Sequence, residues 1–262
     1  MFSKILAGTD GSDTATLALA HAAELAEKLG AELTVVTAHR AGRAGDGAPA
    51  STDPDLVIAG ALLRDVQKMH GDRIALKTRA AAGAAAEVLV ELADQEGFDL
   101  VVVGNRGISR SSVLQPTSVP GRVSRRATVA VLVVDTLDRR PPSYRRILAG
   151  TDGSSTAARA VDAAAELSRG LGAELTLATV APSEHEGRRL LDALRARWPE
   201  TLVHLAAGEP SEALADLAES GEYDLLVLGN KGMTGLRRAL GSVPARVLRR
   251  APTNVLIVHT TG

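Results

Sequence analysis

The stretch KILAGTDGS at residues 4–12 returns as RILAGTDGS at residues 146–154, and this repeat decides the fold of the chain. A second pair follows in the same order, with DLVVVGNRG at residues 99–107 and DLLVLGNKG at residues 224–232. In both pairs an apolar run typical of a buried strand leads into a glycine-containing turn. The chain is therefore an internal duplication of one small unit.

A third pair closes each copy, with SVPGRVSRRATVAVLVV at residues 118–134 and SVPARVLRRAPTNVLIV at residues 242–258. The segment between the two copies is polar and contains a Pro pair, which suits a short extended linker. The repeat predicts a first domain over residues 1–137, a linker over residues 138–145 and a second domain over residues 146–262.

Strand-like and helix-like segments alternate through the first copy. Strands are predicted at residues 4–9, 32–39, 73–80, 99–104 and 129–134, and helices at residues 14–30, 55–70, 84–96 and 118–126. Such alternation predicts right-handed crossovers and a parallel sheet covered by helices on both faces. The expected fold class is α/β: two tandem doubly wound domains, each with a five-stranded parallel sheet in the order 3-2-1-4-5 flanked by helices.

The second copy repeats this alternation with shorter pieces. Its strands are predicted at residues 146–151, 173–180, 202–208, 224–229 and 254–258, and its third helix at residues 212–220. The additional length of the first copy falls mainly in residues 41–55. The Gly, Pro, Ser and Asp content of that segment predicts a loop.

Composition narrows the class of function. The chain has 262 residues, 45% of them hydrophobic, and a formal net charge of -1, so no general attraction to nucleic acid or to an anionic membrane is expected. It has no cysteine, and its six histidines show no pair at ligand spacing, so neither a disulfide nor a metal site is expected. His21 has no catalytic partner nearby in the sequence. Without a signal-peptide pattern or a long apolar stretch, the expected location is the cytoplasm.

The glycine-rich turns are the candidate ligand-binding elements. If strands one and four of each copy are neighbours, the loop after Gly8 faces the loop after Gly104, and the loop after Gly150 faces the loop after Gly229. Glycines allow backbone N–H groups to approach a phosphate, and the next helix N-terminus favours negative charge. Asp152 is placed to accept from a ribose hydroxyl or an adenine amine. The alternative is structural, because Asp-Gly-Ser also suits any turn that caps a helix.

Taken together, these residues resemble the universal stress proteins, whose phosphate motif is similar to G-x2-G-x9-G-S/T. The resemblance covers nearly the whole chain: the TDGS turn, the GN[RK]G run, the SVP helix start and the closing VLVV or VLIV strand follow the family's order. It implies the fold above, ATP binding as in many members, association through the last strand, and roles in stress or dormancy without one agreed reaction. Tandem members look like fused dimers, so the copies are expected to pair about a pseudo-twofold axis through residues 129–134 and 254–258.

The resemblance also implies a set of nucleotide-binding residues, with ATP as the cofactor and Mg²⁺ as its optional companion. In the first copy they are Gly8, Asp10, Ala38, Gly104, Arg106, Gly107, Thr117, Ser118 and Val119. In the second copy they are Gly150, Asp152, Val180, Gly229, Lys231, Gly232, Gly241, Ser242 and Val243. No catalytic residue is assigned.

Each copy departs from the family's motif once. The first copy has Thr117 where the family shows glycine, and a Cβ there is expected to hinder a phosphate. The second copy keeps Gly241 and Ser242 but places them one residue closer to Gly232 than the motif does. Because a loop tolerates a deletion better than a phosphate-contacting glycine tolerates a side chain, the second copy is expected to bind better.

Three functions remain open from the sequence. The leading one is a nucleotide-responsive stress sensor or binding module, with an adenine nucleotide as ligand and a homo-oligomer or an unidentified protein as partner. The second is a slow ATP-hydrolysing enzyme in which Asp10 and Asp152 hold Mg²⁺, although no Walker-type GxxxxGK[ST] motif is present. The third is a nucleotide-free dimeric scaffold.

Overall fold

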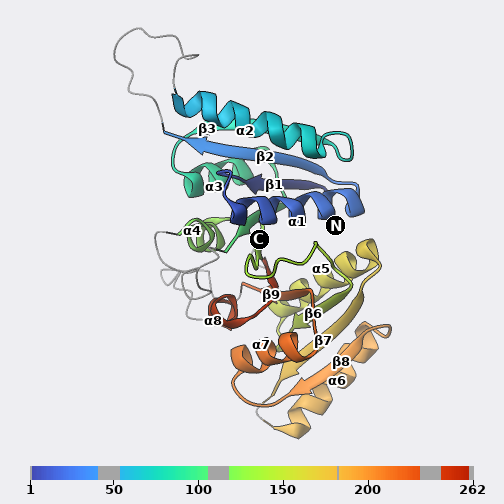
Figure 1. The fold of residues 1–262 in the computed structure, drawn as a ribbon. Coiled ribbons are helices and arrows are strands. Elements are labelled where there is room, and N and C mark those ends of the chain that lie inside the picture. The colour runs from blue at the N-terminus through green and yellow to red at the C-terminus, as the bar shows by residue number, and fades with distance from the viewer. Residues whose placement is uncertain (1, 41–53, 106–117, 182, 231–242, 260–262) are drawn as a thin grey trace.

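The computed structural model of the chain describes residues 2–40, 54–105, 118–181, 183–230 and 243–259 (Figure 1). The N-terminal half contains β1 (Lys4–Gly8), α1 (Asp13–Leu29), β2 (Glu32–His39), α2 (Pro54–His70), β3 (Leu76–Ala82), α3 (Ala85–Glu96), β4 (Leu100–Gly104), α4 (Val119–Arg126) and β5 (Ala130–Val134). The C-terminal half contains β6 (Arg146–Gly150), α5 (Ser155–Leu171), β7 (Glu174–Val180), α6 (Glu184–Arg197), β8 (Leu202–Ala206), α7 (Pro210–Ser220), β9 (Leu225–Gly229), α8 (Val243–Arg250) and β10 (Asn254–Val258).

The strands form one ten-stranded sheet with the order β3-β2-β1-β4-β5-β10-β9-β6-β7-β8. Within each half all pairings are parallel, so the predicted order 3-2-1-4-5 is confirmed twice. The halves join through β5 and β10, which pair antiparallel with Leu132 opposite Leu256. This pairing agrees with the expected pseudo-twofold relation, and Figure 1 shows the two halves on either side of it. Each half thereby covers the open edge strand of the other.

Local signals explain why the repeated segments form the same helices. The side chain of Ser12 accepts a hydrogen bond from the backbone N–H of Ala15 and caps α1, and Ser154 caps α5 in the same way through Ala157. The first helix ends at Gly30, as predicted, in the left-handed conformation with φ of 64°. Gly172 ends α5 in the same conformation with φ of 66°, so the two helices have the same length of 17 residues.

Some predicted boundaries are wrong. The third strand was expected at residues 73–80 but runs from Leu76 to Ala82, because the backbone N–H of Ile74 still donates to the carbonyl of His70 at the end of α2. The predicted loop over residues 41–55 overlaps α2, which begins at Pro54, a residue whose fixed φ suits the first turn. The rest of that loop, residues 41–53, lies outside the described residues.

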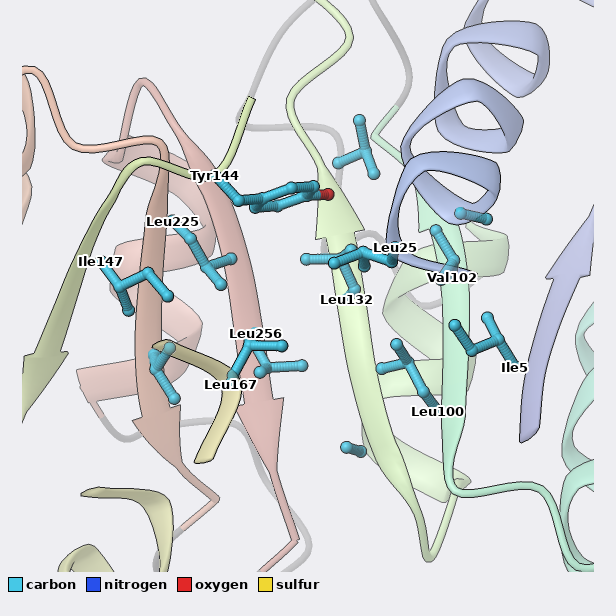
Figure 2. Close-up of a cluster of buried hydrophobic side chains, with 14 of the residues drawn as sticks. Ile5, Leu25, Leu100, Val102, Leu132, Tyr144, Ile147, Leu167, Leu225 and Leu256 are labelled. Carbon is cyan, nitrogen blue, oxygen red and sulfur yellow. The ribbon is translucent and has the colours of Figure 1, made fainter. Parts of the chain in front are cut away.

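Two layers of apolar side chains hold the sheet. One face carries α1, α2, α5 and α6, and the other carries α3, α4, α7 and α8. Each layer contains residues of both halves, so the core is continuous across the β5–β10 seam. Figure 2 shows Leu25, Val102 and Leu132 on one side of the seam, and Leu225 and Leu256 on the other. Across the described ranges, no helix combines the length and apolar character that crossing a bilayer requires.

The segment between the halves is more buried than its polar sequence suggests. Tyr144 belongs to the core, and its hydroxyl lies 2.9 Å from Nδ1 of His21 on α1, in a hydrogen bond. Asp135 is also buried and accepts from the side-chain amide of Asn105. This segment therefore packs between the halves. The predicted domain boundaries around it stay a prediction.

Candidate functional site

Each half has a pocket at the carboxyl ends of its first and fourth strands, where a doubly wound sheet leaves a crevice. The pocket of the C-terminal half has a volume of about 230 Å³. It is lined by Gly150, Thr151, Asp152, Ala157, Ala178, Val180, Pro210, Leu214, Leu228, Gly229, Val243 and Pro244. The pocket of the N-terminal half has a volume of about 140 Å³. It is lined by Gly8, Thr9, Asp10, Ser12, Thr14, Ala15, Val36, Ala38, Ala85, Val88, Leu89, Val103, Gly104, Val119 and Pro120.

The loop after the first strand is shaped by its own side chains. In the C-terminal half, Gly153 has φ of +75°, and its backbone N–H donates to the Thr151 hydroxyl at 3.1 Å. Oδ1 of Asp152 accepts from the backbone N–H of Ser154 at 3.0 Å. Asp10 does the same with Ser12 in the N-terminal half. The structural role considered for these aspartates is therefore present, and it leaves each carboxylate beside its pocket.

The glycine at the end of the first strand packs closely against two leucine side chains. A Cβ added to Gly150 would lie 2.6 Å from Cδ2 of Leu228 and 2.9 Å from Cδ1 of Leu214. Both distances are too short for carbon atoms. Glycine at this position lets two leucines approach the strand end, where they form part of the pocket wall.

A threonine pair distinguishes the loops of the two halves. In the N-terminal half, the buried Thr37 hydroxyl donates to the carbonyl of Thr9 at 2.6 Å and ties the loop to β2. The corresponding hydroxyl of Thr179 on β7 is buried and has no hydrogen-bond partner in the described part of the chain. The loop of the C-terminal half thus lacks this tie to its neighbouring strand.

Because of this difference, the same substitution is expected to change the free energy of unfolding differently in the two halves. Thr37→Val is expected to lower the free energy of unfolding by about 1 kcal/mol, because the Thr9 carbonyl loses its donor. Thr179→Val is expected to be neutral or stabilising, since it removes a buried hydroxyl that has no partner. Urea unfolding monitored by circular dichroism measures both. Equal destabilisation by the two changes would contradict the assignment.

The structure brings most of the described candidate residues together. Gly150, Asp152, Val180, Gly229 and Val243 line one pocket, and Gly8, Asp10, Ala38, Gly104 and Val119 line the other. Ser118 lies apart from the lining, where its hydroxyl caps α4 by accepting from the backbone N–H of Gly121. Arg106, Gly107, Thr117, Lys231, Gly232, Gly241 and Ser242 lie outside the described residues. Nucleotide binding by these residues stays a prediction.

Sequence reasoning missed the apolar walls of both pockets. Leu214 and Leu89 occupy the same position in α7 and α3, and both face the glycine that ends the first strand. Pro244 and Pro120 are a second matched pair. The signal that could have found them is the identity of these residues at matching positions of the two halves. Within the described parts of the chain, no three His, Cys, Asp or Glu side chains gather as they would around a metal ion.

Comparison with known proteins identifies relatives that match part of the chain and others that match nearly all of it. The model of the Universal stress protein family matches residues 1–135, 143–192 and 182–259. A universal stress protein of Mycobacterium tuberculosis is 37% identical over an alignment of 145 positions that covers 45% of this chain and 99% of that protein. One of Bacillus subtilis is 29% identical over an alignment of 147 positions that covers 44% of this chain and 99% of that protein.

Among solved structures, a universal stress protein from Archaeoglobus fulgidus has a TM-score of 0.78 at 21% identity and covers 98% of this chain and 96% of that one. This likeness concerns the fold. A universal stress protein solved in complex with cAMP is 39% identical, with a TM-score of 0.40, and covers 45% of this chain and 99% of that one. The two curated relatives each cover less than half of this chain, whereas the Archaeoglobus structure covers nearly all of it.

Proposed function

This chain belongs to the universal stress protein family, and from that premise we propose that it is a nucleotide-responsive binding module whose C-terminal half holds ATP. The observation that carries the proposal is the convergence of five candidate residues, Gly150, Asp152, Val180, Gly229 and Val243, on one pocket. They come from four separate segments of the chain, and the fold alone brings them together.

The lining of this pocket suits a nucleoside. Leu214, Leu228 and Val180 provide apolar walls of the kind that accommodate a planar base. Thr151 and Asp152 add polar groups at one side, where a ribose hydroxyl or an adenine amine has acceptors. With a volume of about 230 Å³, this pocket is the larger of the two. These features support the C-terminal half as the binding half.

In this proposal, the bound nucleotide orders the loops beside the pocket and changes how the chain associates with a second copy or with another protein. The setting that fits is the cytoplasm, where ATP is abundant. Mg²⁺ accompanies the phosphates as an optional partner. The continuous β5–β10 seam favours a second candidate, a scaffold that uses the fused halves without any nucleotide.

Filling the pocket tests the proposal. Ala157 lines the pocket from the first turn of α5, and Ala157→Leu extends an apolar side chain into the space of the base. We expect at least a 10-fold loss of ATP affinity, which corresponds to about 1.4 kcal/mol. The measurement is equilibrium dialysis of the full chain against labelled ATP, with cAMP as a second probe. The matched control is Ala158→Leu, one residue further along the same helix and outside the pocket lining.

The same titration separates the alternatives. Unchanged affinity in Ala157→Leu would move the nucleotide away from this pocket, and no binding up to millimolar ATP would leave the scaffold in its place. Release of ADP with steady turnover above about 0.1 s⁻¹, abolished by Asp152→Ala, would instead make the chain a slow ATPase, since most enzymes turn over at roughly 1 to 10³ s⁻¹.

A further inference from the structure

We infer that Val36 and Val88 exclude a nucleoside from the N-terminal pocket, so that the two halves of this chain differ in what they bind. The inference rests on the proposed function of the C-terminal half and adds a specificity-determining pair of residues. It starts from the pocket volumes, about 140 Å³ in the N-terminal half and about 230 Å³ in the C-terminal half. Pockets for drug-sized ligands begin at roughly 300 Å³. Both pockets are smaller than that, and the N-terminal pocket is the further below that volume.

The two halves can be compared position by position because their backbone contacts repeat. Val36 corresponds to Ala178: the carbonyl of each accepts from the threonine after the first strand, Thr9 or Thr151, at 2.9 Å. Each of the two also pairs with the glycine that ends the first strand. A valine in one half therefore stands where an alanine stands in the other.

Val88 corresponds to Ala213 in the same way. The backbone N–H of Val88 donates to Ala84 at 3.0 Å at the start of α3, and that of Ala213 donates to Glu209 at 2.9 Å at the start of α7. Val88 is buried and lines the N-terminal pocket, whereas Ala213 does not reach the lining of the other. Cγ2 of Val88 lies 3.1 Å from the position that a Cβ of Gly83 would take, so the side chain of Val88 lies close to the loop before α3.

Comparison of the described lining positions then points to these two residues. The other lining positions of the N-terminal pocket carry either the same residue type as the C-terminal half or a smaller one. The smaller ones are Ala38 for Val180, Ala85 for Pro210 and Val103 for Leu228. Those three differences would enlarge the N-terminal pocket, yet it is the smaller one. Among the described lining residues, only Val36 and Val88 act in the observed direction.

The decisive experiment counts ATP bound per full-length chain by equilibrium dialysis at saturating ATP. The wild-type chain is expected to bind one ATP, and Val36→Ala/Val88→Ala is expected to bind two. Adding Ala157→Leu to that double variant should return the count to one and place the new site in the N-terminal half. The control is Val101→Ala/Val131→Ala, which removes the same atoms from the same apolar cluster away from the pocket and should still bind one.

A reciprocal variant keeps the test decisive if the double variant does not fold, which circular dichroism and thermal melting check. Ala178→Val/Ala213→Val should weaken ATP binding at least 10-fold, and unchanged affinity would overturn the inference. A count of one for both wild type and a folded Val36→Ala/Val88→Ala overturns the inference and leaves the proposed function standing. A count of two for wild type also overturns the inference and leaves the proposed function standing. A count of zero for every chain overturns both.

Discussion

Leu132→Ala is expected to lower the free energy of unfolding of the whole chain by about 3 kcal/mol, although the substitution lies in one half only. Leu132 is about 1% exposed and faces Leu256 across the antiparallel β5–β10 pair. It belongs to an apolar cluster that contains residues of both halves (Figure 2). Removing its side chain leaves a cavity at the seam, so both halves lose packing together.

Two probes measure this coupling in guanidinium unfolding. Circular dichroism reports helices of both halves, and the fluorescence of Trp198, the single tryptophan, reports the C-terminal half alone. The two transitions should coincide in wild type and shift together in Leu132→Ala. Leu202→Ala on β8 is the control, because that leucine is 60% exposed and should change stability by less than about 0.5 kcal/mol. An unshifted Trp198 transition would mean that the halves unfold independently.

His21 is expected to make the protein less stable as the pH falls from about 6.5 to about 4. Burial lowers the pKa of His21 from 6.5 to about 4, and the carboxylates of Asp138 and Asp224 raise it only in part. The side chain is 6% exposed, and its Nδ1 is bonded to the hydroxyl of Tyr144, whose own pKa burial raises. The folded protein therefore holds His21 neutral and Tyr144 protonated.

The direction of the change in stability with pH follows from proton binding. Between these pKa values the unfolded chain protonates His21 and the folded chain does not, so acid favours unfolding. The contribution is fully present above pH 6.5 and is lost as the pH falls through about 4, and it amounts to about 3 kcal/mol. Urea unfolding of wild type and His21→Leu at several pH values isolates it, because other titrating groups cancel in the difference. His185→Leu on the exposed start of α6 is the control. A pH-independent difference would refute the assignment.

Much of the fold could be predicted from the repeat. The strand order, the parallel halves and the pairing of residues 129–134 with 254–258 agree with the structure. The start of β3 could not be predicted, because it depends on how the turn after α2 bonds back to His70. For the site, glycine and aspartate positions pointed to strand ends at which each half has a pocket, and five candidate residues in each half line it.

By itself, the sequence determined the architecture and the strand ends that carry the candidate site. It could do so because hydrophobic period, helix caps and glycine stops act over a few residues and appear twice in this chain. Only the tertiary structure decided which half has the larger pocket, and it also buried Tyr144 against His21. Those outcomes depend on side chains that are far apart in the sequence or on different elements, such as Val36 on β2 and Val88 on α3. These side chains come together only after the chain has packed.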